Sequence, residues 1–508
     1  MPYAPKIASV VRNGLFLAAA LLLTLPLAAN NLPDPNFWFD ESGQFWMAKG
    51  LNHFSPPLSE DGSLYQVMLS NRQYNLDPGG FTLLLHFWLQ GGSDPVWLRM
   101  LPYLFLVLTL FGLMLSVFEV SESAFLAAAA AGVLLLPFPM ILSYGFELRP
   151  YGMEVAGIIA VFYCLLRSVR VPSSGNLLLL GVVSSFFLTS RYSFIIPAAS
   201  AGIVLFLCVY RGSLRKFALG ASGFYLPLVC IGALIWVISF SHQNPGGSTP
   251  FYVKGFVLQG KAWPQVLQLI QTNFWSVRDF CYVIFIALVP LCCSWLERRC
   301  GCRREILRAA WLFLFSFQIL LVGLSLAGKY PWHINTRWDL NMQVLVILAD
   351  ALLLVLAAGW LRQQFFSSAG RWGKLATALC LLLMLALPLT TNKKVHYSND
   401  ALYPYLVSLG EEKLAGSGFF VGYYAAPSIR YTFEYGSFRD RRDIYPQNFH
   451  FESREEFGRQ GRLATSRFDV ALIALVDEEG LKKYRQRLGE QFRLDKSQPL
   501  SYLLLKAE

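Results

Sequence analysis

Charged residues are scarce in this sequence. Only 15% of its 508 residues are charged and 55% are hydrophobic, and the mean hydropathy is +0.44. Soluble globular proteins carry about 25% charged residues. The composition therefore excludes a soluble multidomain protein and favours an integral membrane protein.

Cysteines are missing from the three long polar stretches at 30–95, 241–279 and 391–508, although the chain contains nine. We therefore expect no disulfide framework in those stretches. Four cysteines lie close together, but the first two end an apolar run and no histidine is near; they are Cys292, Cys293, Cys300 and Cys302. We interpret them as apolar or interfacial cysteines, with zinc as the alternative.

A broad basic patch is lacking as well. The net charge is +11, but the basic residues gather in short loops between apolar runs. Such a distribution is typical of membrane orientation, so we predict no nucleic-acid partner.

Eleven apolar runs approach the ~20 residues that a bilayer-spanning helix needs. They occupy about 14–29, 96–118, 124–143, 151–167, 176–190, 193–210, 217–240, 280–296, 309–328, 342–361 and 374–391. Twelve or thirteen spans are the alternative. A break at Ser190-Arg191-Tyr192 divides the stretch 176–210, and a single tilted helix there would reverse the sidedness of everything after it.

The charge pattern predicts a cytoplasmic N-terminus and a retained signal-anchor as the first span, because positive residues recur in alternate loops. These residues are Arg167, Arg170, Arg211, Arg215, Lys216, Arg298, Arg299, Arg303, Arg304, Arg308, Arg362, Arg371 and Lys374. The loops 30–95, 143–150, 190–192, 241–279 and 329–341 and the C-terminus are then external. A bacterial inner membrane is the expected location, with the endoplasmic reticulum as the alternative.

The composition changes at about residue 392, since the last 118 residues hold 34 of the 75 charged side chains. Apolar runs at 418–423, 468–475 and 501–505 predict strands, and 478–488 predicts a helix. We expect a transmembrane domain at 1–391 and a small external α/β domain at 392–508.

The central feature of the sequence is Asp40-Glu41, which begins an aromatic-rich amphipathic segment directly after the first apolar run. Charge near hydrocarbon costs several kcal/mol, so an acid pair there suggests a function. The alternative is a helix start in which Asp40 is the N-cap and Glu41 complements the helix dipole. Further on, Phe81–Trp88 is too short to span and is expected to lie in the interface.

The predicted topology brings charged residues from several short loops to one membrane surface. They are Asp40, Glu41, Glu147, Arg149, Arg191, Lys329, His333 and Arg337. Cations at the water boundary suit a phosphate whose lipid tail stays in the bilayer, and carboxylates suit a general base. Alternatives are that Glu147 pairs with Arg149, that Arg191 reaches the headgroups, and that Arg337 pairs with Asp339. The pattern predicts inverting sugar transfer from a polyprenyl-phosphate-linked donor.

Several motifs resemble the GT-C membrane glycosyltransferases of the protein O-mannosyltransferase and lipid A aminoarabinose-transferase type. The resemblance rests on Asp40-Glu41 with Ala48, on Phe81–Leu89 followed by Gly92-Ser93-Asp94, on Trp97-Leu98-Arg99-Met100-Leu101-Pro102, on Glu147-Leu148-Arg149-Pro150-Tyr151 and on Thr336-Arg337-Trp338. It covers roughly residues 14–390. One departure is Asp77-Pro78-Gly79, where many relatives have His-Pro-Pro or Lys-Pro-Pro.

The resemblance implies a GT-C-like bundle in which Asp40 is the catalytic base and Glu41 its neighbour, and in which Arg337 or Arg191 contacts the donor phosphate. The implied substrate-binding set is Glu147, Arg149, Tyr151, Arg191, Lys329, His333 and Arg337. The acceptor is a lipid, a glycan or a protein. We expect no cofactor, with a divalent ion held by His53 and Glu41 as the alternative.

Two other classes of protein stay open. A transporter of the lipid-linked sugar would carry charges inside its spans, where Glu154 and Asp350 are the main examples here. A non-catalytic envelope assembly protein would tolerate replacement of the loop carboxylates.

Overall fold

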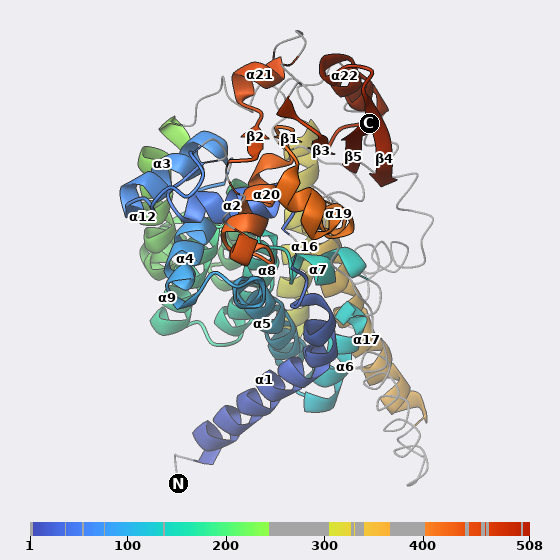
Figure 1. Ribbon diagram of the computed structural model, residues 1–508. Coiled ribbons are helices and arrows are strands. Elements are labelled where there is room, and N and C mark those ends of the chain that lie inside the picture. The colour runs from blue at the N-terminus through green and yellow to red at the C-terminus, as the bar shows by residue number, and fades with distance from the viewer. Residues whose placement is uncertain are drawn as a thin grey trace. The chain divides into compact units, whose positions relative to one another are not determined.

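In a computed structural model of the 508-residue chain, the residues described are 4–35, 37–52, 55–75, 77–135, 138–242, 304–326, 330, 340–365, 402–441, 445, 447–458, 463, 467–498 and 501–507. The chain divides into two compact units. Figure 1 labels their helices and strands. Unit 1 comprises Met1–Asn31, Asn75–Phe81 and Pro102–Val395, and unit 2 comprises Leu32–Tyr74, Thr82–Leu101 and His396–Glu508.

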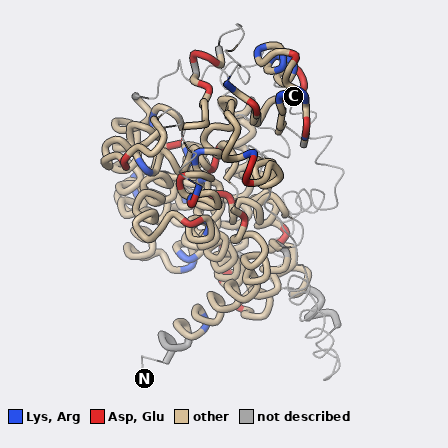
Figure 2. The backbone as a smooth tube through the Cα atoms, in the orientation of Figure 1, with Lys and Arg blue, Asp and Glu red and all other residues tan. Residues whose placement is uncertain are grey.

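Unit 1 is helical, and its apolar sequence explains why. Its helices are α1 (Ala4–Asn31), most of α5 (Pro95–Ser121), α6 (Ala124–Leu135), α7 (Pro139–Tyr144), α8 (Tyr151–Arg170), α9 (Ser174–Leu188), η2 (Tyr192–Phe194), α10 (Ile195–Val204), η3 (Leu205–Val209), α11 (Leu214–Gly220), α12 (Ser222–Ile238), η4 (Phe240–His242), α16 (Arg304–Leu326) and α17 (Leu340–Phe365). A helix satisfies its own backbone groups, as a lipid surrounding requires. Acidic and basic residues are sparse along these helices (Figure 2).

Six helical segments in the described part are long and apolar enough to cross a membrane, or seven if the pair α11 and α12, bent by 73°, counts as one span. The chain is thus an integral membrane protein, while the predicted count of eleven spans is not confirmed. Two of the predicted spans, 280–296 and 374–391, lie outside the described residues, as does the predicted domain boundary near 391.

The structure separates α9 from η2 and α10 at Thr189–Arg191, which confirms the predicted break. Arg191 has the extended backbone angles φ −150° and ψ 149°. The predicted span over 124–143 is not one continuous helix, because its described residues form two short helices, α6 and α7. Pro139 stands at the start of α7, where its missing N–H is tolerated, whereas it would interrupt a longer helix.

Unit 2 contains a sheet and short helices from distant parts of the chain. Its helices are α2 (Phe39–Ala48), α3 (Leu64–Tyr74), most of α4 (Gly80–Trp88), η1 (Leu89–Gly91), the start of α5, α19 (Leu402–Gly416), α20 (Ala426–Glu434), η5 (Arg439–Arg441), α21 (Arg454–Gly458) and α22 (Glu478–Leu488). The strands are β1 (Phe419–Val421), β2 (Phe449–Phe451), β3 (Val470–Ala474), β4 (Phe492–Gln498) and β5 (Ser501–Lys506).

The five strands form one sheet in the order β2-β1-β3-β5-β4. Strand β1 pairs in parallel with β2 and β3, while β5 is antiparallel to β3 and β4. The expected α/β character of the C-terminal residues is confirmed, including α22 at 478–488. Sequence patterns did not reveal β2 or β4.

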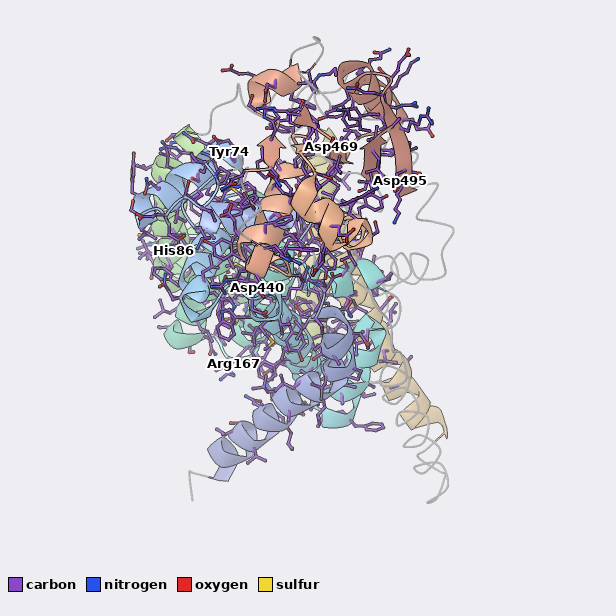
Figure 3. The ribbon with its side chains drawn as sticks, in the orientation of Figure 1. Tyr74, His86, Arg167, Asp440, Asp469 and Asp495 are labelled. Carbon is purple, nitrogen blue, oxygen red and sulfur yellow. The ribbon has the colours of Figure 1, made fainter. Side chains whose placement is uncertain are left out.

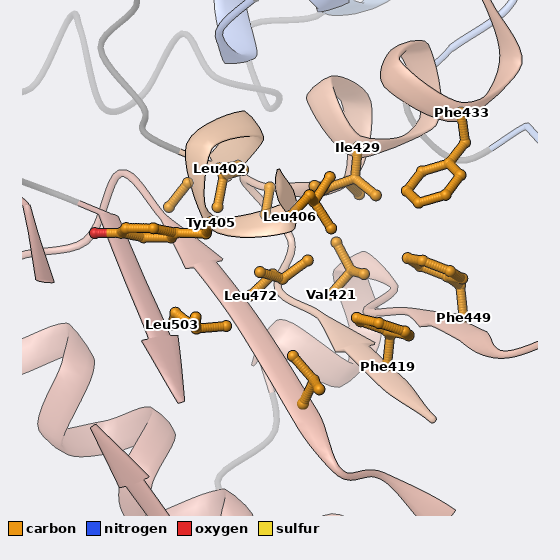
Figure 4. Packing of buried hydrophobic residues seen from close by; sticks show 14 of the residues in the cluster. Leu402, Tyr405, Leu406, Phe419, Val421, Ile429, Phe433, Phe449, Leu472 and Leu503 are labelled. Atoms are coloured by element: carbon orange, nitrogen blue, oxygen red, sulfur yellow. The ribbon is translucent and has the colours of Figure 1, made fainter. Parts of the chain in front are cut away.

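Alternate residues of the strands face two hydrophobic cores. Phe419 and Leu472 pack on the side of α19 and α20 (Figure 4). Phe420 and Ile473 pack on the side of α22. This period of two is what a sheet covered on both faces requires. Asp469, labelled in Figure 3, accepts a hydrogen bond of 2.9 Å from the backbone N–H of Gly418 at the start of β1.

Candidate active site

The acid pair lies in the first turn of α2. Trp38 is the N-cap residue and makes no side-chain capping bond, so the alternative in which Asp40 is the cap is wrong. The side chain of Ser42 donates instead to the carbonyl of Phe37 at 2.9 Å. Asp40 is half-buried, whereas Glu41 is fully buried. The two neighbouring carboxylates therefore have different surroundings.

Glu41 pairs with Arg99 of α5. The guanidinium Nη2 lies 3.5 Å from Oε2 of Glu41, and both side chains are 0% exposed. Arg99 also donates to the carbonyl of Asp34, and its guanidinium carbon lies 4.5 Å from the ring centre of Phe37. Each charge compensates the other in the protein interior, so the pair fixes the start of α2 to the start of α5. Arg99 was part of the Trp97–Pro102 motif in the sequence analysis but not among the candidate site residues.

Helix α20 packs against α2 inside unit 2 (Figure 1). The indole N–H of Trp46 donates to the carbonyl of Pro427 at 3.1 Å. The guanidinium carbon of Arg430 lies 4.4 Å from the Trp46 ring centre. Every residue of α20 is buried. Residues close to the C-terminus thus support the helix that carries the acid pair, and no sequence pattern indicated this.

Tyr431 joins α20 to the surroundings of Glu41. Its ring centre lies 4.4 Å from that of Phe37, and its hydroxyl donates to the carbonyl of Ser93 at 3.0 Å. Burial raises the pKa of the Tyr431 phenol well above its ordinary value, with Arg99 lowering it and Glu41 among the groups raising it. The phenol therefore stays protonated at neutral pH and acts as a donor.

The other end of α2 is held by polar contacts from the loop and from α4. Gln44 donates to Thr82 at 2.7 Å, and the Thr82 hydroxyl donates to Asn71 at 2.5 Å. The ring Nδ1 of His86, labelled in Figure 3, lies 2.8 Å from the carbonyl of Ala48. The predicted short helix at 81–88 is confirmed as α4, and it contacts α2 through these side chains.

A second group of the predicted residues meets in unit 1 around Arg191. Its Nη1 lies 2.8 Å from Glu154, and its Nε lies 3.4 Å from Asp77. Ser193 donates to the other oxygen of Glu154. Arg191 is only 6% exposed. The alternative in which Arg191 extends to the headgroups is therefore wrong, because two carboxylates hold it inside the protein.

Burial lowers the pKa of Arg191, but the carboxylates of Glu154 and Asp77 raise it by more, so the net shift is upward. The guanidinium is therefore charged at every pH of interest. The backbone N–H of Gly80 donates to the carbonyl of Thr189 at 2.9 Å, which ties the turn of Asp77 to the turn of Arg191. The sequence signal that could have indicated this cluster is Glu154, a glutamate within an apolar run.

The Glu147–Tyr151 stretch lies against the same cluster. The Arg191 guanidinium carbon is 5.0 Å from the Tyr151 ring centre, and that of Arg149 is 5.6 Å from it. Arg149 also donates to the Tyr151 hydroxyl at 3.5 Å, and its backbone N–H donates to the carbonyl of Glu147 at 2.7 Å. Glu147 and Tyr151 are buried and Arg149 is half-buried. The structure thus brings Arg149 and Arg191 to the ring of Tyr151.

Three predicted residues, Lys329, His333 and Arg337, lie outside the described residues, and so does His53. Among the residues that the structure does describe, there is no group of three or more histidine, cysteine, aspartate or glutamate side chains suited to hold a metal ion.

No protein-family model matches the chain, and no curated protein sequence matches it. Two solved structures have a similar path of the backbone. One is the oligosaccharyltransferase of Archaeoglobus fulgidus in a complex with zinc and sulfate, with a TM-score of 0.49 and 14% identity over 82% of this chain and 61% of the other. The second is arabinosyltransferase EmbB from Mycobacterium smegmatis, with a TM-score of 0.40 and 14% identity over 95% of this chain and 45% of the other.

The chain thus spans 61% of the length of the first of these proteins and 45% of the second. Both TM-scores lie under 0.5, so these similarities by themselves assign neither a fold family nor an activity.

Proposed function

We propose that this protein is a GT-C glycosyltransferase that moves a sugar from a polyprenyl-phosphate-linked donor to an acceptor hydroxyl at the external side of a membrane. The observation that carries the proposal is the first turn of α2, in which Glu41 is buried against Arg99 while the adjacent Asp40 is half-buried. Neighbouring carboxylates in different surroundings are suited to different roles. The motifs that resemble the GT-C family supply the reaction class.

In the proposed reaction Asp40 is the general base. It accepts the proton of the acceptor hydroxyl while that oxygen bonds to the anomeric carbon of the donor sugar. The bond from this carbon to the lipid phosphate breaks on the opposite face, and the phosphate leaves with the bonding electrons. The anomeric centre is inverted. Glu41 stays paired with Arg99 and positions Asp40 through the rigid helical turn.

Arg337 or Arg191 is the proposed contact for the donor phosphate. A guanidinium offers donors in a fork that matches phosphate oxygens. In the structure, Glu154 and Asp77 hold the Arg191 guanidinium near the ring of Tyr151, and Arg149 and Tyr151 belong to the proposed substrate-binding set. Lys329, His333 and Arg337 remain in the proposed substrate-binding set with Glu147.

The location that fits this reaction is the inner membrane of a bacterium, with a cytoplasmic N-terminus and unit 2 facing outward. The alternation of basic loops along the chain supports this orientation.

Transport of the lipid-linked sugar is the second candidate, and one observation favours it. Glu154 is fully buried inside α8, and a buried ionisable residue in a span often marks a transport path. A transporter would move the intact donor and form no glycosidic bond, so an assay of sugar transfer separates the two candidates.

The test uses the full-length protein in nanodiscs, a panel of radiolabelled polyprenyl-phosphate sugars, and an envelope extract as acceptor. We expect label in the extract, and a rate about 10²–10⁴ lower for Asp40→Asn, because this change removes the base and keeps the shape. Glu60→Gln, at an exposed glutamate of the same loop, is the matched control and should transfer at the parent rate. Equal rates for Asp40→Asn and the parent would show that Asp40 is not the base.

A further inference from the structure

Four aromatic side chains of unit 2 form a continuous cluster, which we call the aromatic platform: Phe39, Tyr423, Tyr424 and Phe457. The ring centres of Phe39 and Tyr424 are 5.2 Å apart, and those of Tyr424 and Tyr423 are 5.1 Å apart. Phe457 lies 5.0 Å from Tyr423, nearly parallel to it, and 5.4 Å from Tyr424. The platform unites residues from the start of α2, the turn after β1 and helix α21.

The platform stands at the carboxyl edge of the parallel strands. Tyr423 and Tyr424 follow β1 after Gly422, and α21, with Phe457, follows β2 (Figure 1). In open sheets with parallel strands, ligands bind outside this edge. The place in the fold is thus one at which a binding site is expected.

A buried ionic cluster of Glu452, Tyr484 and Arg487 supports the platform. Glu452, which is 2% exposed, accepts hydrogen bonds from the backbone N–H of Tyr423 at 2.9 Å, from the Tyr484 hydroxyl at 2.5 Å and from Arg487 at 2.6 Å. Arg487 also donates to the carbonyl of Glu456 in α21 at 2.7 Å. These bonds fix the turn after β1 and helix α21 in one arrangement, as a preformed binding surface requires.

The rings are only partly covered. Phe457 is 37% exposed, and Phe39, Tyr423 and Tyr424 are half-buried. Two of the four carry a phenol hydroxyl, and acidic residues of α21 lie beside Phe457 in sequence. An acyl chain prefers a wholly apolar groove. A sugar ring has an apolar face of C–H groups and a rim of hydroxyls, which matches aromatic faces edged by phenols and carboxylates.

We propose that the aromatic platform binds the saccharide part of the acceptor, so that the acceptor is a glycan. This inference rests on the proposed function and deepens it. Phe39 and Asp40 are consecutive, and their Cα atoms are about 3.8 Å apart. A glycan bound on Phe39 and Tyr424 therefore lies next to the helical turn that carries the proposed base.

The experiment measures binding of fluorescently labelled full-length protein to a printed array of bacterial and synthetic oligosaccharides that carry no lipid. We expect the parent to bind a defined set of them and Tyr424→Ala and Phe457→Ala to bind that set roughly tenfold more weakly. Tyr65→Ala removes a tyrosine of the same unit that is 73% exposed, and it should bind like the parent. Because Phe457 is exposed, its removal leaves the fold intact, which melting curves of each variant will check.

The readout does not depend on catalysis, so the array reports on the platform by itself. If the oligosaccharides are bound as expected while Asp40→Asn transfers sugar at the parent rate, the assignment of the base fails and the platform stands. If the parent binds no oligosaccharide, or if Tyr424→Ala and Phe457→Ala bind as well as Tyr65→Ala, the platform is not a glycan site. An acceptor identified as a lipid or a protein without sugar would also overturn the inference.

Discussion

Replacing Glu41 by glutamine should destabilise unit 2 by about 3 kcal/mol. Breaking a buried ion pair by removing one partner costs about 3–5 kcal/mol, because the remaining charge stays buried without compensation. The remaining charge here is that of Arg99, whose side chain is 0% exposed. In Glu41→Gln, Arg99 keeps its hydrogen bond to the carbonyl of Asp34 and its contact with the ring of Phe37. We therefore expect a cost at the lower end of the range of about 3–5 kcal/mol.

The assay is thermal unfolding of the full-length protein in detergent, combined with hydrogen exchange of the peptide that covers Phe39–Ala48. For a folding unit of about 150–250 residues, each kcal/mol lowers Tm by roughly 2–4 °C, so we expect a decrease of about 6–12 °C. Exchange in α2 should accelerate more than exchange in α22, because α2 contains Glu41 whereas α22 contains neither partner of the pair.

Two further variants make this prediction specific. Glu60→Gln removes the same charge from an exposed glutamate and should change Tm by less than about 2 °C. The double variant Glu41→Gln with Arg99→Met removes both charges, so it should recover much of the loss. The reasoning is refuted if Glu41→Gln melts like Glu60→Gln, or if the double variant melts lower than the sum of the two single changes predicts.

Two more predictions concern the other ionic groups. Glu154→Gln should lower Tm by more than Asp77→Asn, because Arg191 lies 2.8 Å from Glu154 and 3.4 Å from Asp77. Melting curves of both variants test this order. An equal or larger decrease of Tm for Asp77→Asn would contradict it. Burial raises the pKa of Glu456, but hydrogen bonds from Ser453 and the charge of His450 lower it by more, to a value below the ordinary one of about 4.5. The stabilising contribution of the Glu456 carboxylate is therefore present above pH 4.5 and is lost as the pH falls through the lowered pKa. The measurement is the denaturant concentration at which half of the protein is unfolded. Between pH 5 and pH 3 this concentration should fall less for Glu456→Gln than for the parent.

Much of the helical part could be predicted from the sequence. Runs of about twenty apolar residues indicate helices because a segment in lipid must satisfy its backbone groups internally, which depends on local composition. The break at Thr189–Arg191 was visible because a polar triplet interrupts an apolar run. The break within 124–143 was missed, since the run stays apolar there and only its prolines indicate an interruption.

The candidate site was predictable only in part. The sequence drew attention to Asp40 and Glu41 by their place after an apolar run, and to Arg149, Tyr151 and Arg191 by short motifs. It could not distinguish the buried Glu41 from the half-buried Asp40, because burial depends on residues far along the chain.

Local composition and periodicity thus determined that the protein has membrane-spanning helices and an α/β region near its C-terminus. The tertiary structure decided which charges meet: Arg99 with Glu41, Arg191 with Glu154 and Asp77, and helix α20 with α2. The physical reason is that an ion pair or a packed ring contact requires two segments to come within a few ångströms, and this distance follows from the fold and not from the residues of either segment alone.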